Sequence, residues 1–126
     1  ELLHLAQKVQ RATFLLGDFA DTFAQLKSGD VVYCDPPYSP INRTSNFTAY
    51  SGQSFTDEDQ KRLVAAAIGA KARGISTLIS NHYVDFTREI YASADTHSLF
   101  SVQRSISQNG QKRQRVQEIL ALYSAG

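Results

Sequence analysis

The sequence lacks methionine and tryptophan altogether, and it has a single cysteine among 126 residues. One cysteine excludes an internal disulfide, and Cys34 therefore fits a reducing compartment such as the cytoplasm. No apolar run approaches the roughly 20 residues of a membrane-spanning helix, and no signal-peptide pattern is present. We therefore expect a protein without a membrane partner.

The missing methionine also bears on the length of the protein. The chain begins Glu1-Leu2-Leu3, and a first side chain as long as glutamate is unusual after removal of an initiator. We therefore expect residues 1–126 to be a single fragment of a longer protein: enough for one domain, but small for a complete cofactor enzyme. The three histidines show no metal-ligand spacing, so we expect no metal site.

Charge is nearly balanced, and a net charge of +1 is too small to indicate a nucleic-acid partner by itself. Its distribution says more, because Lys112, Arg113 and Arg115 cluster in one predicted loop and Arg104 lies upstream. These cations either contact phosphates or form a solvated hairpin tip, and the sequence favours neither interpretation.

Hydrophobic periodicity predicts alternating helices and strands. We expect helices over 2–9, 19–26, 57–73 and 84–94, buried strands over 13–16, 31–34 and 75–79, and a final hairpin over 98–106 and 116–123. Residues 39–54 read as a long loop, and Asn109-Gly110 favours a turn. This order predicts an α/β fold with a mostly parallel sheet and an antiparallel C-terminal hairpin. Ligands of such sheets gather at the carboxyl ends of the strands.

The tetrapeptide Asp35-Pro36-Pro37-Tyr38 stands at such an end, directly after the apolar run 31–34. An exocyclic amine of a base is a poor nucleophile, because its lone pair is delocalised into the ring. Two acceptors aimed at its hydrogens favour a more tetrahedral nitrogen and stabilise the positive charge that develops. The Asp35 carboxylate and the Pro36 carbonyl suit this role, since consecutive prolines fix the backbone direction before substrate arrives.

Tyr38 completes this interpretation, because its ring can stack on the face of a base. A base inside a duplex cannot reach such a pocket, so it must be flipped out at a cost of a few kcal/mol. The tetrapeptide therefore predicts an amino-group methyltransferase that acts on a DNA base. The alternative is a proline-rich turn that places Asp35 and Tyr38 on the surface.

Beyond the tetrapeptide, the chain resembles the Dam family of DNA adenine-N6 methyltransferases over its whole length. The matching stretches are Asp30-Val31-Val32-Tyr33-Cys34-Asp35-Pro36-Pro37-Tyr38, Asn46-Phe47-Thr48-Ala49-Tyr50, Ser54-Phe55-Thr56, Leu78-Ile79-Ser80-Asn81-His82, Arg104-Ser105-Ile106-Ser107, Asn109-Gly110 and Glu118-Ile119-Leu120-Ala121-Leu122-Tyr123. The tetrapeptide alone is shared with other amino methyltransferases, whereas the set together is specific.

This resemblance implies transfer of a methyl group from S-adenosyl-methionine to N6 of adenine, usually within GATC, in a bacterial or phage-encoded enzyme. It also implies that Asp35 lies beside the amino acid part of the cofactor and that Asp18 lies near its adenine. Asn46 and Tyr50 would belong to a mobile loop beside the target base. The resemblance favours DNA as the partner of Arg104, Lys112, Arg113 and Arg115.

The sequence departs from the family in two ways. Its glycines form no cofactor loop, and it contains no target-recognition domain. The resemblance thus covers the catalytic-side half of a class I, Rossmann-like methyltransferase domain, whose strand order is commonly 3-2-1-4-5-7-6. Residues 13–16 would be strand 3, while strands 1 and 2 are missing. Strand 31–34 would then expose an unpaired edge that invites self-association.

Other interpretations stay open. RNA guanine-N2 and protein-glutamine methyltransferases use related tetrapeptides, and a non-catalytic DNA-binding or assembly role is a further alternative. We expect Cys34 to be a core residue rather than a nucleophile, because free cysteines are among the most buried residues. His82, which follows the strand 75–79, is expected to have a supporting or solvent role.

Overall fold

The computed structural model describes residues 1–42, 54–105 and 113–126. Its helices are α1 (Leu2–Val9), α2 (Phe19–Gln25), α3 (Asp57–Ala72) and α4 (Asp85–Ile90). Its strands are β1 (Val31–Cys34), β2 (Ser76–His82), β3 (Thr96–Ser105) and β4 (Arg113–Tyr123). Of the described helices, none has both the length and the apolar character needed to cross a bilayer.

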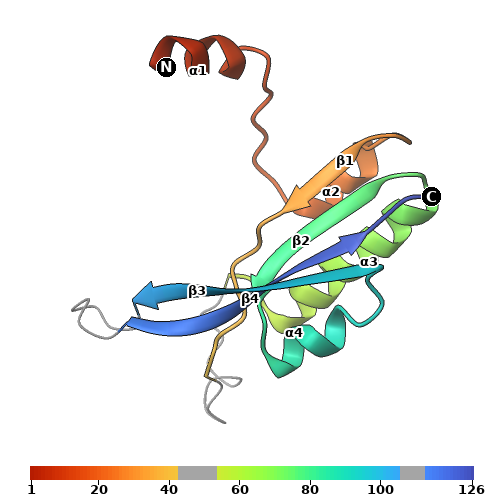
Figure 1. Ribbon diagram of the computed structural model, residues 1–126. Helices are drawn as coiled ribbons and strands as arrows, with labels where there is room; N and C mark the ends of the chain where they lie inside the picture. The colour runs from red at the N-terminus through yellow and green to blue at the C-terminus, as the bar shows by residue number, and fades with distance from the viewer. Residues whose placement is uncertain (43–53, 106–112) are drawn as a thin grey trace.

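The four described strands form one sheet in the order β1-β2-β4-β3 (Figure 1). This order agrees with the last four strands of the order implied by the resemblance. Strands β1 and β2 are parallel, with Cys34 opposite Ile79, whereas β2/β4 and β3/β4 are antiparallel. The prediction of a mostly parallel sheet was therefore wrong, because β4 inserts antiparallel between β2 and β3 and only one pair is parallel.

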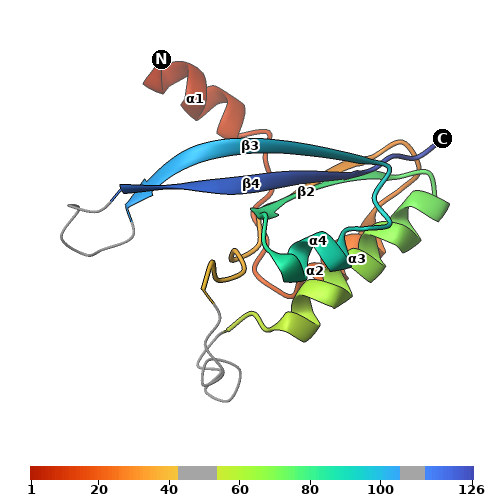
Figure 2. The same ribbon diagram turned by 60° about the horizontal axis from the view of Figure 1, so that its bottom comes forward.

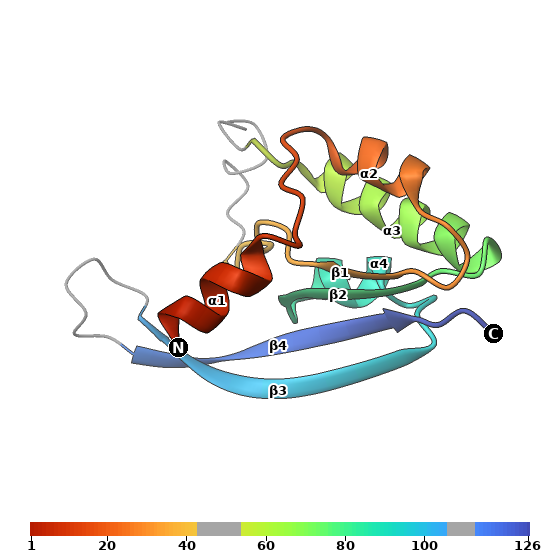
Figure 3. The same ribbon diagram turned by 90° about the horizontal axis from the view of Figure 1, so that it is seen from above.

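Helices α2, α3 and α4 cover one face of the sheet (Figure 2). The core lies between them and consists of apolar side chains that point from both layers. Its fully buried members include Ala67 of α3, Ile79 of β2 and Ala121 of β4. The β3/β4 pairing continues beyond the end of β2, so the hairpin projects from the body of the protein (Figure 3).

Helix α3 begins and ends where its sequence signals predict. Thr56 accepts a hydrogen bond from the Asp59 amide while the Asp59 carboxylate accepts one from the Thr56 amide, which forms a capping box. The helix ends before Gly74, whose φ of 83° requires a residue without a side chain. The Arg73 guanidinium then donates to the carbonyls of Phe23 and Leu26, which ties α2 to the end of α3.

The N-terminal part departs from the prediction. Helix α1 forms over 2–9 as expected, but it has no buried residue and stands apart from the other helices (Figure 1). Residues 13–16 are not a strand, and Phe14, Leu15 and Leu16 are all exposed. A strand needs a hydrogen-bonding neighbour, and none of the described strands lies beside this segment. Strand β1 is accordingly an edge strand, as expected, with Val31 78% exposed.

Candidate active site

The tetrapeptide lies where two parallel strands end together. Asp35 follows β1 directly, and the register that pairs Cys34 with Ile79 places it beside Ser80 near the end of β2. Three polar residues, Ser80, Asn81 and His82, occupy that end of β2. Because both carboxyl ends meet at one edge of the sheet, side chains distant in sequence converge on the tetrapeptide.

Asp35 is exposed and stands at the end of a chain of hydroxyl groups. The Ser80 hydroxyl donates to Asp35 Oδ1 at 3.1 Å, and the Tyr33 hydroxyl donates to Ser80 Oγ at 3.1 Å. Among the described residues, no other donor contacts the carboxylate. One of its oxygens is therefore oriented by the sheet, while the other has no donor among the described residues and can accept from a ligand.

The Tyr38 ring is held between groups from two strands. The His82 ring meets it edge to face at a centroid distance of 4.9 Å, and the Arg104 guanidinium lies 5.6 Å from its centroid. Burial raises the pKa of the Tyr38 phenol, a hydrogen bond with Ser80 opposes this, and the carboxylates of Glu118 and Asp35 raise it further. Tyr38 and Asp35 therefore both lie beside Ser80, although they line different pockets.

Arg104 is not a free surface cation. Its Nε lies 3.1 Å from Oε1 of Glu118, and a second guanidinium nitrogen contacts the same oxygen. Glu118 is buried, and the pair raises the pKa of Arg104 by stabilising its charged form. The ion pair with Glu118 thus holds Arg104 over the Tyr38 ring, a contact that the sequence did not predict.

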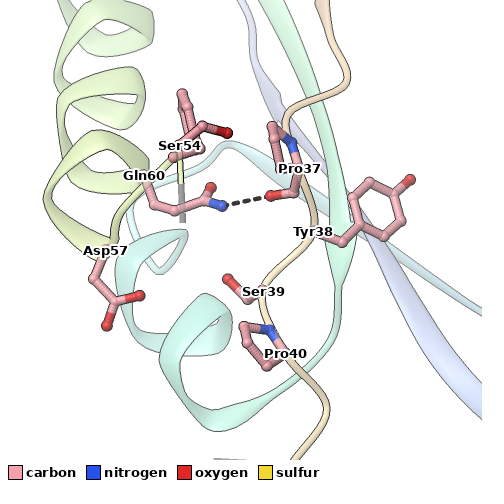
Figure 4. A pocket seen from close by; sticks show the side chains of 8 residues that line it. Pro37, Tyr38, Ser39, Pro40, Ser54, Asp57 and Gln60 are labelled. Carbon is pink, nitrogen blue, oxygen red and sulfur yellow. Dashed lines mark hydrogen bonds between the residues drawn. The ribbon is translucent and has the colours of Figure 1, made fainter. Parts of the chain in front are cut away.

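The prolines present their carbonyls differently. The Pro37 carbonyl accepts from Gln60 Nε2 of α3 at 2.8 Å, and the Tyr38 ring points away from Gln60 (Figure 4). No described residue donates to the Pro36 carbonyl. The Pro36 carbonyl, which the sequence predicted as an acceptor for the amine, therefore has no donor among the described residues.

Two pockets flank the tetrapeptide. One, of about 250 Å³, lies between α2, β1 and α3, with apolar walls that include Phe19, Val32 and Leu63 and with Asp35 and Pro36 also in its lining. The other, of about 200 Å³, is bounded by residues 37–40, Ser54, Phe55, Asp57 and Gln60 (Figure 4). The first pocket combines apolar walls with a carboxylate, which suits a flat ring that carries an amine.

Asp18 lies outside the lining of both pockets. It precedes α2, and its carboxylate pairs with Arg62 at 2.7 Å, while Arg62 also pairs with Asp59 at 2.7 Å. The next residue, Phe19, does line the apolar pocket, and the Arg62 guanidinium lies over the Phe19 ring. The structure thus places Asp18 next to the pocket, engaged with a cation.

The predicted DNA-contacting residues are only partly described. Asn46, Tyr50 and Lys112 lie outside the described residues, while Arg113 and Arg115 are exposed at the start of β4. The described residues contain no group of three or more metal-ligating side chains. Burial raises the pKa of Cys34 to about 11, which disfavours the nucleophilic thiolate.

Gln60 was not predicted from the sequence as a part of the site. Gln60 is 3% exposed and reaches both Pro37 and Asn81. Its signal was present, because it lies three and four residues before the buried Leu63 and Val64 and therefore on the apolar face of α3. A polar residue on such a face needs a buried partner.

Comparison with known proteins identifies the family of this chain. Residues 1–106 match the family profile of the D12 class N6 adenine-specific DNA methyltransferases. The chain is 49% identical over 126 residues to the DNA adenine methylase of Escherichia coli K12, which covers 100% of this chain and 45% of that protein. It is 47% identical over 125 residues to that of Vibrio cholerae O395, which covers 98% and 45%.

The DNA adenine methylase of Haemophilus influenzae is 46% identical over 126 residues, which covers 99% of this chain and 44% of that protein. The chain thus spans somewhat less than half the length of these relatives. The profile match extends over most of the chain and includes the whole tetrapeptide. This chain belongs to the family of D12 class N6 adenine-specific DNA methyltransferases.

Proposed function

We propose that this chain forms the amine-binding site of an enzyme that transfers a methyl group from S-adenosyl-methionine to N6 of adenine in DNA. The observation that carries the proposal is the Asp35 carboxylate, which is exposed and accepts a hydrogen bond from Ser80, the residue that also interacts with Tyr38. A buried Asp35, or a Tyr38 ring on another face, would have removed the basis for this chemistry.

The proposed reaction uses three groups of this chain. The free oxygen of Asp35 and the Pro36 carbonyl accept hydrogen bonds from the adenine amine, and the Tyr38 ring stacks on the base. Positive charge develops on the nitrogen as the methyl group arrives, and the Asp35 carboxylate stabilises it. The amine proton can leave after attack, so no strongly basic side chain is needed.

The adenine must leave the duplex to reach Asp35 and Tyr38, so the proposed substrate is double-stranded DNA with one flipped base. Arg113 and Arg115 are exposed on the projecting hairpin, where phosphate contacts would add salt-dependent affinity. The proposal that DNA also contacts Lys112, Asn46 and Tyr50 rests on the resemblance alone. The same resemblance supplies GATC as the sequence to test first and a bacterial or phage cytoplasm as the location.

The apolar pocket of about 250 Å³ is the proposed cofactor contact. Its aromatic and aliphatic walls fit the purine of S-adenosyl-methionine. The Asp35 carboxylate fits the amino group of the amino acid part of the cofactor. When bound, the cofactor supplies the methyl group. The pocket is smaller than the roughly 300–1,000 Å³ of typical small-molecule sites, so we expect this 126-residue chain alone to bind the cofactor very weakly.

The proposal is tested with the full-length product of the gene that encodes this chain. The protein is incubated with methyl-labelled S-adenosyl-methionine and duplexes with or without GATC, and the modified nucleoside is identified by mass spectrometry. We expect N6-methyladenine in the GATC duplex. Label on guanine in RNA or on protein glutamine would replace this proposal with one of the related activities, and DNA binding without any label would leave a binding role.

A second proposal concerns assembly. Strand β1 is an edge strand whose Val31 and Tyr33 side chains are exposed, and a free edge can pair with another chain. We therefore propose that the 126-residue chain self-associates through β1. Light scattering should show dimers that become monomers in Val31→Lys, because a charge on an edge opposes pairing. A monomeric wild-type chain at about 100 μM would refute self-association.

A further inference from the structure

A buried amide lies behind the tetrapeptide. Asn81 is 0% exposed, and its Oδ1 accepts from the backbone amides of Ser39 at 2.8 Å and His82 at 2.9 Å. Its Nδ2 donates to Gln60 Oε1 at 3.1 Å and to the Tyr91 hydroxyl at 3.0 Å. All four hydrogen-bonding positions of this amide are therefore used. Two backbone N–H groups fix which side carries the oxygen.

The orientation of Asn81 dictates that of Gln60. Because the Asn81 donor faces Gln60 Oε1, the Gln60 Nε2 group must point the other way, and it donates to the Pro37 carbonyl at 2.8 Å. Asn81 and Gln60 therefore form a directional relay from β2 through α3 to the tetrapeptide. If Gln60 turned over, its carbonyl would face the Pro37 carbonyl, and if Asn81 turned over, its carbonyl would face that of Gln60.

The relay holds the backbone on both sides of Tyr38. Gln60 holds the Pro37 carbonyl just before it, and Asn81 holds the Ser39 amide just after it. The Ser39 carbonyl in turn lies 2.8 Å from Nδ1 of His82, whose ring packs against Tyr38. Figure 4 shows Gln60 on one side of this backbone and the Tyr38 ring on the other.

We propose that Gln60 and Asn81 are positioning residues that set the Tyr38 ring where it can stack on the target base, an inference that rests on the proposed function. Burying two amides is costly unless their groups are paired, and here two of the partners, the Pro37 carbonyl and the Ser39 amide, belong to the loop that carries Tyr38. The partners are residues 23 and 42 positions away along the chain. The relay therefore couples the sheet and α3 to one aromatic ring.

The inference is tested with two near-isosteric variants of the full-length gene product. Gln60→Met keeps the length of the side chain and removes the donor to Pro37. Asn81→Asp keeps both acceptor contacts to the backbone but loses its donors, so Gln60 turns and presents a carbonyl to Pro37. Ile75→Val is the matched control, because it truncates a fully buried side chain outside the loop.

Single-turnover methylation and steady-state kinetics separate positioning from binding. We expect kcat to fall about 10- to 100-fold in Gln60→Met and Asn81→Asp while KM changes by less than about threefold, because a ring misplaced by about 1 Å can cost on the order of 100-fold. Ile75→Val should retain the wild-type kcat. An unchanged kcat in both Gln60→Met and Asn81→Asp, or an equal loss in Ile75→Val, would overturn the inference.

A second measurement does not depend on catalysis. Hydrogen exchange of the Ser39 amide, followed by nuclear magnetic resonance, should be slow in the wild type and faster by about tenfold or more in Asn81→Leu, since a lost hydrogen bond is worth roughly that factor. Rapid exchange in the wild type would overturn the relay. A protein that methylates nothing would overturn the proposed function. Hydrogen exchange of the Ser39 amide would then test by itself whether the relay exists.

Discussion

Replacing the Asp35 carboxylate by an amide gives the sharpest test of the proposed chemistry. Asp35→Asn keeps the size of the side chain and an oxygen that can accept from Ser80, which lies 3.1 Å from Oδ1. Because Asp35 is exposed, the lost charge is screened by solvent and its hydrogen bond contributes at most about 1 kcal/mol to stability. The unfolding temperature should therefore move by only a few degrees.

Activity should respond far more strongly. With its oxygen held by Ser80, the new amide presents an N–H₂ group to the hydrogens of the adenine amine, and donor faces donor. If the amide turns over instead, the contact with Ser80 is lost. Either way one preorganised electrostatic contact disappears, and such losses cost about 100- to 1,000-fold in kcat, or roughly 3–4 kcal/mol.

The assay is incorporation of labelled methyl groups into GATC duplex by the full-length gene product under single-turnover conditions. The matched control is Asp85→Asn, which removes another exposed carboxylate that pairs with Arg88 on the surface of α4. We expect the control to methylate at the wild-type rate. An Asp35→Asn protein that keeps more than about a third of the wild-type rate would refute the assigned role of the carboxylate.

Three further predictions follow from the surroundings of the site. Glu118→Gln should weaken the charge pair with Arg104. We expect kcat to drop about tenfold and the free energy of unfolding, measured by urea titration, to fall by about 1–3 kcal/mol. An unaltered kcat would show that the pair does not support the site. Burial raises the pKa of Tyr91 to about 12, so the unfolded state ionises first. The free energy of unfolding should therefore be constant below about pH 10 and should fall by roughly 2–3 kcal/mol as the pH rises to about 12. In Tyr91→Phe, the free energy of unfolding should depend less on pH in that window. Cys34, with its pKa raised from 9.0 to about 11, should be alkylated on the order of 100-fold more slowly at pH 8 than after unfolding, and an equal rate would contradict its burial.

Local signals in the sequence predicted much of the fold. The capping pattern at Thr56 and the glycine at 74 set the bounds of α3 to within a residue or two. The apolar run 31–34 is β1, and the tetrapeptide follows it as expected. These features succeeded because each depends on a few neighbouring residues, whose capping, periodicity and turn chemistry agree.

The errors concern pairing between distant segments. Residues 13–16 have the composition of a buried strand, but composition cannot supply the neighbour to which a strand must bond. The same limit explains the wrong prediction of a mostly parallel sheet. The antiparallel place of β4 between β2 and β3 is decided by the register of Ile119 and Asn81 and their neighbours, which no local window contains.

The site shows the same division. Asp35, Pro36 and Tyr38 were visible as a short motif, while their partners Gln60, Ser80 and Glu118 come from three other elements. The position of Gln60 on the apolar face of α3 indicates that it has a buried partner, but the sequence does not identify that partner. Only the packing of α3 against β2 brings Gln60 to Pro37 and Asn81.

The two sides of the tetrapeptide differ in how completely this chain builds them. On one side, hydrogen bonds from Asn81 of β2 and Gln60 of α3 and the ring of His82 hold the backbone and ring of Tyr38 before any ligand arrives. The side that faces α2 is an apolar pocket beneath β1, a strand whose other edge is free. Under the proposed function, the geometry of the target base would be set by this chain, whereas a chain that pairs with β1 would extend the proposed cofactor pocket. Addition of a pairing partner should therefore tighten cofactor binding without altering the slow exchange of the Ser39 amide.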